Sequence, residues 1–180
     1  TYGIRFAGSP AVSDNLKLPL EAEYANQIDY GDNPTDFSVD YYHFSGGFMI
    51  PAKDSLVSKI NAKIGYEVLG SDEETPFQTP LGANHKFNGW ADVFGINKPA
   101  EGLKDLYGSI GATVEGLKMD VVYHAFEAET GGSDYGQEYD ASLSYKFLKH
   151  YTVLAKYAYY EADEYKTDTQ KFWLQLDVSF

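Results

Sequence analysis

Lys171-Phe172-Trp173-Leu174-Gln175-Leu176-Asp177-Val178-Ser179-Phe180 is the stretch that decides the fold. Successive side chains of a β-strand point to opposite faces of its sheet. One face therefore carries Phe172, Leu174, Leu176, Val178 and Phe180, and the other carries Trp173, Gln175, Asp177 and Ser179. The stretch predicts a strand with one apolar and one polar face. The rest of the chain must decide whether the apolar face contacts a protein core or lipid.

Composition excludes a transmembrane helix and leaves a transmembrane β-barrel open. The 180 residues contain no run of about 18 apolar residues, the length that a spanning helix needs. Barrel strands alternate over only about ten residues, so a mean hydropathy of -0.39 does not argue against them. Aromatic residues make up 16% of the chain, and cysteine is absent, which excludes disulfides and thiolate metal sites.

Charge and motif content exclude several other classes. A net charge of -13 with a single arginine, Arg5, argues against a nucleic-acid partner. No nucleophile and base stand out as a catalytic set, so an enzyme is not predicted and no cofactor is expected. The histidines lack metal-ligand spacing and are expected to be isolated polar residues: His43, His85, His124 and His150.

The alternation of the final strand recurs along the whole chain. Nine strands are predicted, at about 1–8, 16–29, 37–50, 57–69, 104–115, 117–127, 136–147, 151–162 and 169–180. Short turns such as Glu115-Gly116 alternate with longer connections at 70–103 and 128–135, as in outer-membrane barrels. The predicted fold is all-β: an antiparallel transmembrane β-barrel of the outer-membrane type over 1–180, located in the bacterial outer membrane.

Aromatic residues sort by height along the predicted strands. Phe147, Tyr151 and Phe180 lie beside short turns, and the long loops are flanked by Tyr24, Tyr66, Tyr139 and Tyr159. Two aromatic belts around an aliphatic band are typical of the two lipid interfaces. The alternative is a soluble β-sandwich or lipocalin-like barrel, in which the apolar set would fill the interior.

Strand parity assigns the charged residues to a polar lumen. The predicted basic residues are Arg5, Lys17, Lys59, Lys63, Lys118, Lys146, Lys156 and Lys171. The predicted acidic residues are Glu21, Glu23, Asp40, Glu67, Asp120, Glu138, Asp140 and Asp177. The two sets balance, which suits either a weakly selective pore or a ladder of cross-strand ion pairs that stiffens the wall.

The connection 70–103 is long and aromatic, so it is expected to be ordered. It is either an extracellular loop packed on its neighbours or a loop that folds into the pore. In the second case His85, Phe87 and Trp90 are the candidates for the constriction. Acidic loop residues at 72–74 and 161–164 are either solvated or bind divalent cations that bridge to lipopolysaccharide.

Four stretches resemble the alginate-export family of bacterial outer-membrane porins, in its C-terminal portion. They are Thr79–Phe94, Gly102–Tyr107, Val121–Phe126 and Thr167–Leu174. The resemblance covers about 57–180 and implies a single-chain antiparallel barrel larger than this chain. It also implies that Phe180 is the insertion signal read by the barrel-assembly machinery. Strand direction agrees, because 1–8 and 169–180 are predicted to run the same way, which makes Thr1 an internal point of a larger barrel.

The predicted function is a passive outer-membrane channel for small or saccharide-type solutes. An exporter of a polyanion should be rich in arginine, which argues against alginate as the solute. The alternative is a structural or adhesive barrel that conducts nothing. Lipid and lipopolysaccharide are the expected partners, and the oligomeric state is left open.

Overall fold

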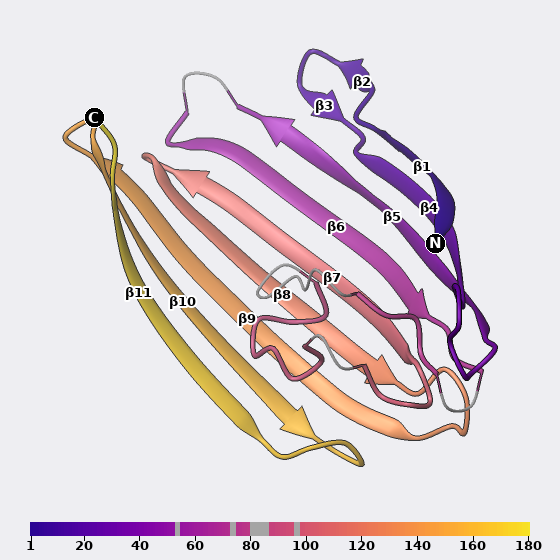
Figure 1. The fold of residues 1–180 in the computed structure, drawn as a ribbon. Coiled ribbons are helices and arrows are strands. Elements are labelled where there is room, and N and C mark those ends of the chain that lie inside the picture. The colour runs from indigo at the N-terminus through magenta and orange to yellow at the C-terminus, as the bar shows by residue number, and fades with distance from the viewer. Residues whose placement is uncertain (53–54, 73–74, 80–86, 96–97) are drawn as a thin grey trace.

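The protein forms one antiparallel sheet of 11 strands in the computed structural model (Figure 1). The structure describes all residues except 53–54, 73–74, 80–86 and 96–97. The strands are β1 (Tyr2–Gly8), β2 (Ala11–Ser13), β3 (Leu16–Lys17), β4 (Leu20–Ile28), β5 (Ser38–Pro51), β6 (Val57–Leu69), β7 (Leu103–Val114), β8 (Leu117–Glu127), β9 (Asp134–Phe147), β10 (Tyr151–Ala162) and β11 (Thr169–Val178). The described residues contain no helix that could span a bilayer.

The main strands are neighbours in chain order, β1-β4-β5-β6-β7-β8-β9-β10-β11. The tightest turns lie at one end, where Glu115 and Gly116 have φ of 48° and 84° and Leu148 and Lys149 have φ of 46° and 63°. Such positive φ values allow short turns that follow the right-handed twist of the paired strands. The prediction of an all-β antiparallel sheet with short turns at one end is confirmed.

Two small differences from the predicted strands lie near the beginning of the chain. The predicted strand 16–29 is divided into β3 and β4 at Pro19, which has no backbone N–H to donate to a ladder. The short strand β2 was not predicted; it pairs with β3, and Lys17 of β3 pairs with Met49 of β5. A strand of three residues carries too little alternation to be recognised from sequence.

The sheet is open in the described structure, because the path of paired strands begins at β1 and ends at β11. Of the predicted transmembrane β-barrel, the structure therefore supports an all-β antiparallel sheet that is open and curved (Figure 1). Every pairing along the path is antiparallel. With nine strands on the path, β1 and β11 run in the same direction.

One face of the sheet is an exposed apolar surface from edge to edge. Ile110 in the middle of the sheet is 68% exposed, and Phe172 and Leu174 on β11 are 67% and 70% exposed. Cross-strand neighbours continue the surface, as where Ile60 pairs with Ala112 and Ala155 with Leu174. We call this the apolar face. A soluble sandwich would bury such a surface, but none of the described residues forms a layer over the apolar face.

Tyrosines lie along the loop end of the apolar face. Tyr24 and Tyr42 lie 5.4 Å apart, ring centre to ring centre, and Tyr123 and Tyr139 lie 5.2 Å apart. At the turn end Phe147 stacks on Tyr151 at 5.5 Å. The predicted separation of aromatic residues by height is thus present on the strands.

Asp40 corrects the predicted lumen set, because it lies on the apolar face. It accepts hydrogen bonds there from the hydroxyls of Tyr24 (2.9 Å) and Tyr42 (3.2 Å) and from the amide of Asn26 (2.9 Å). The reason is parity: Asp40 is two residues from Tyr42, so both side chains point to the same face.

The opposite, polar face is partly covered by the long connection between β6 and β7. This connection lies across the middle of the sheet (Figure 1), although Leu69 and Leu103 at its two ends are paired with each other. Beneath it is the small buried core, which includes Leu103, Phe126 and Tyr160 together with Phe94 from the connection. The core of this fold is therefore formed by a loop packed onto a sheet.

Candidate functional site: the polar cavity beside the docked segment

Residues 87–95 of the connection, which we call the docked segment, are anchored to the polar face at Asn88. The Asn88 amide donates to Glu67 of β6 at 2.5 Å and to Asp105 of β7 at 3.4 Å. Asn88 is 3% exposed and has φ of 55°, a left-handed conformation that asparagine tolerates better than most residues. One side chain thus joins the segment to two adjacent strands.

The next anchor uses the backbone of the docked segment. The N–H groups of Trp90 and Ala91 donate to Asp140 (3.2 Å) and Glu138 (2.7 Å) of β9. Gly89 brings the backbone this close: its φ is 82°, and a Cβ there would overlap the Glu138 carboxylate. Hydrogen bonds from neutral donors to a charged acceptor are among the stronger ones in proteins.

Four carboxyl groups lie beneath the docked segment: Glu67, Asp105, Glu138 and Asp140, which we call the carboxyl cluster. They are 5%, 1%, 0% and 1% exposed. The Lys98 ammonium lies above them, donating to the Asn88 side chain at 2.6 Å and to the Phe94 carbonyl at 2.8 Å. Burial lowers the pKa of Lys98, and the negative charges of Glu67 and Asp105 act in the opposite direction.

The far side of the docked segment packs against β8 to β11. The Phe94 ring lies 4.5 Å from the Phe126 ring and stacks on Tyr165 at 5.3 Å. The Lys156 ammonium lies 4.7 Å above the Trp90 ring, and Lys171 pairs with Asp92 at 3.3 Å. Apolar packing and cation contacts together hold the segment on this half of the polar face.

A cavity of about 810 Å³ remains on the other half, between the docked segment and strands β1 to β8. Charged side chains from the strands, aromatic rings and the docked segment line it, including Arg5, Glu21, Glu23, Lys63, Tyr107 and Phe87. Arg5 pairs with Glu21 at 2.7 Å and with Glu23 at 3.5 Å. Lys63 lies over the Tyr107 ring at 4.8 Å. The cavity is therefore polar, aromatic and internally paired in charge.

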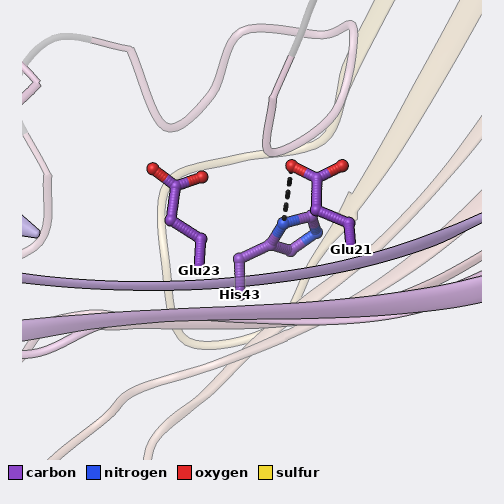
Figure 2. A group of neighbouring side chains, drawn as sticks. All are labelled: Glu21, Glu23 and His43. Carbon is purple, nitrogen blue, oxygen red and sulfur yellow. Dashed lines mark ion pairs between the residues drawn. The ribbon is translucent and has the colours of Figure 1, made fainter. Parts of the chain in front are cut away.

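Glu21, Glu23 and His43 are the one group in the described residues with the proximity of metal ligands. Figure 2 shows the Glu21 carboxylate beside the His43 ring, with Glu23 pointing to the same side. Their ligand atoms lie within 4.8 Å of one another, but Arg5 already binds both carboxylates. A guanidinium in this position supplies the positive charge that a metal ion would bring, so the group is better described as an ion-pair cluster.

The predicted lumen residues other than Asp40 fall on the polar face by strand register. Arg5, Glu21, Glu23, Lys63 and Glu67 line the cavity. Glu138, Asp140 and Lys156 contact the docked segment. Lys17, Lys59, Lys118, Asp120, Lys146 and Asp177 lie toward the turn end, on the face opposite the apolar one.

The predicted constriction residues are partly located. Phe87 and Trp90 line the cavity, Phe87 being 46% exposed. His85 lies outside the described residues, as do Glu73 and Glu74 of the predicted acidic loop. In the other acidic loop, Glu161 accepts from Gln137 at 2.8 Å, and Glu164 accepts from the Asp134 N–H at 3.1 Å.

The expectation of isolated histidines is wrong for two of them. His43 lies 2.9 Å from the Tyr107 hydroxyl, and His124 lies 2.8 Å from Asp105. Strand parity could have placed the side chains of these two histidines and of their partners, Tyr107 and Asp105, on the polar face. Asn88 and Lys98 carry no such signal, because they belong to an irregular segment whose partners are distant in sequence.

Comparisons with protein-family models, with curated proteins and with solved structures find no match for this chain. The resemblance to the alginate-export porins stays a prediction.

Proposed function

We propose that this sheet is part of the wall of a β-barrel channel in the bacterial outer membrane. The apolar face would contact lipid, and the polar face would line a water-filled lumen narrowed by the docked segment. The solutes would be small and polar, with saccharides as the leading class.

The orientation of the tyrosines on the apolar face carries this proposal. Tyr24 and Tyr42 both direct their hydroxyls to Asp40, and Tyr123 and Tyr139 direct theirs to Gln137, at 2.9 and 3.2 Å. Asp40 and Gln137 lie on the loop side of these rings, near the beginnings of β5 and β9. All four rings thus have their polar ends toward the loops and their apolar edges toward the aliphatic band, the arrangement favoured at a membrane interface.

The height of the apolar band agrees with a thin bilayer. Tyr139 and Phe147 bound the band on β9 and are eight residues apart (147 − 139). At about 3.4 Å per residue and a tilt of roughly 40°, this corresponds to a height of about 20 Å, close to the band of outer-membrane barrels.

The cavity supports the choice of solute. Arg5, the single arginine, is already paired with Glu21 and Glu23, so it is not available as a strong site for a polyanion such as alginate. Aromatic rings next to polar groups suit the two faces of a sugar ring. A neutral, hydroxyl-rich solute would leave the ion pairs of the wall intact.

Conductance tests the proposal. The full-length protein, purified in detergent and inserted into planar bilayers, is expected to give discrete ohmic steps that decrease when a permeant saccharide is added. A second candidate, a barrel that conducts nothing, is favoured by the docked segment, which covers half of the polar face. Stable insertion without conductance steps would support that candidate and overturn the channel.

A further inference from the structure

Glu138 and Asp140 form an unusual pair beneath the docked segment. They are neighbours on one face of β9 and are 0% and 1% exposed. Glu138 Oε2 and Asp140 Oδ1 have no hydrogen-bond partner among the described residues, whereas the remaining two oxygens accept from the Ala91 and Trp90 N–H groups. Two carboxyl groups can hydrogen-bond each other only when one of them carries a proton.

We propose that Glu138 and Asp140 bind one shared proton, and that this proton holds the docked segment on the sheet. Loss of the proton at alkaline pH would release the segment. Docking is a property of the fold and can be tested without conduction. The consequence that release widens a pore rests on the proposed function.

The reason is electrostatic. With one proton, the pair carries a single negative charge, which the Trp90 and Ala91 amides stabilise. Without it, two adjacent carboxylates would be buried next to each other, and the repulsion and lost hydration exceed what two amides restore. Water can reach the pair only if the docked segment lifts.

Other charged groups around Glu138 and Asp140 also affect how tightly this proton is held. His124 Nε2 of β8 lies 3.8 Å from Asp140, and His124 also bonds Asp105 of β7. Lys156 of β10 adds positive charge beside Asp140. Tyr160 of β10 pairs across from Glu138 and donates to backbone carbonyls. Within this set, Glu138 and Asp140 are the two carboxyl groups that each have a buried oxygen without a hydrogen-bond partner among the described residues.

Trp90 reports docking directly. The chain has two tryptophans, so replacing Trp173 by Phe leaves Trp90 as the sole emitter. We expect Trp90 emission to shift to the red and acrylamide quenching to rise between about pH 7.5 and about pH 9.5. This window lies above ordinary histidine titration and below that of tyrosine and lysine.

In Glu138→Gln, a side-chain amide N–H takes the place of the shared proton at every pH. Its amide can donate to Asp140 while its carbonyl accepts from Ala91, so the variant should stay docked across the whole window. Asp140→Asn should behave in the same way and serves if the first variant folds poorly. Glu161→Gln is the matched control, because Glu161 lies at the exposed loop rim and should keep the wild-type transition.

Two results would overturn the proposal: no transition in the parent protein, or an unchanged transition in both Glu138→Gln and Asp140→Asn. In bilayers, a conductance that rises with pH in the parent alone would extend the result to the channel. If fluorescence shows release of the docked segment but no conductance is seen, the shared-proton proposal is supported and the channel is rejected.

Discussion

Gly89 is the residue at which the docked segment most closely approaches the sheet. Its φ of 82° requires a left-handed backbone, and its missing Cβ leaves room for the Glu138 carboxylate. Gly132 has a similar φ of 80° but open space around it. Comparing substitutions at Gly89 and Gly132 therefore separates the effect of backbone strain from the effect of steric contact with Glu138.

Gly89→Ala is expected to displace the docked segment, whereas Gly132→Ala should only cost the roughly 1–2 kcal/mol of a left-handed alanine. Limited proteolysis within 87–95 and Trp90 emission would measure the displacement. Equal protease resistance and emission in the two variants would show that close approach at Gly89 does not hold the segment.

The two faces of β9 are distinguished at the scale of a single strand. Leu143 lies on the apolar face and is 50% exposed, whereas Ser142 lies on the polar face, paired with Asp120 and Lys156 of its neighbours. The two residues are adjacent, so they lie at nearly the same position along the strand. Their substitution by lysine therefore differs chiefly in which face receives the charge.

We expect Leu143→Lys to lower the free energy of unfolding in vesicles by about 2–4 kcal/mol, the cost of a lysine near the bilayer midplane. Ser142→Lys should change it by less than about 1 kcal/mol, since attraction to Asp120 and repulsion from Lys156 partly cancel on this exposed face. Urea unfolding of the reconstituted protein measures both. Equal losses would mean that the apolar face does not contact lipid.

Strands were predictable from sequence where alternation was long. β6, β8 and β10 begin and end within a residue of the predicted ranges. In a sheet with one apolar and one polar face, apolar and polar residues alternate along each strand, so the sequence shows which side chains share a face. Asp40 was assigned to the wrong face because it is a polar residue at a position of the strand that belongs to the apolar face. The docked segment was beyond prediction, because bonds such as Ala91 to Glu138 join residues 47 apart without any local pattern.

In the part of the chain that the structure describes, the sheet has two edge strands, β1 and β11, that run in the same direction. Direct pairing of β1 with β11 would be parallel, unlike every other pairing in the sheet. An antiparallel closure needs an odd number of further strands between these edges. A bilayer requires such closure, because unpaired backbone groups in hydrocarbon are costly.

We therefore expect cysteines placed at Ile4 and, in turn, at Phe172, Leu174 or Leu176 not to cross-link within one assembled molecule. The chain has no natural cysteine to interfere. A short thiol-reactive cross-linker should join the control pair Ala155→Cys and Leu174→Cys, which face each other on β10 and β11. Efficient cross-linking between β1 and β11 would instead show that the sheet closes on itself.

The pairing of Leu69 with Leu103 has a consequence for how this protein can vary. The long connection leaves the sheet and returns to the adjacent strand, so its two ends are already neighbours in the ladder. The sheet and the long connection are therefore separable units. A hairpin turn could replace the connection without breaking the β6–β7 pairing. Connections of other chemistry could be exchanged on an unchanged sheet, which would alter the groups on the polar face and leave the apolar face as it is.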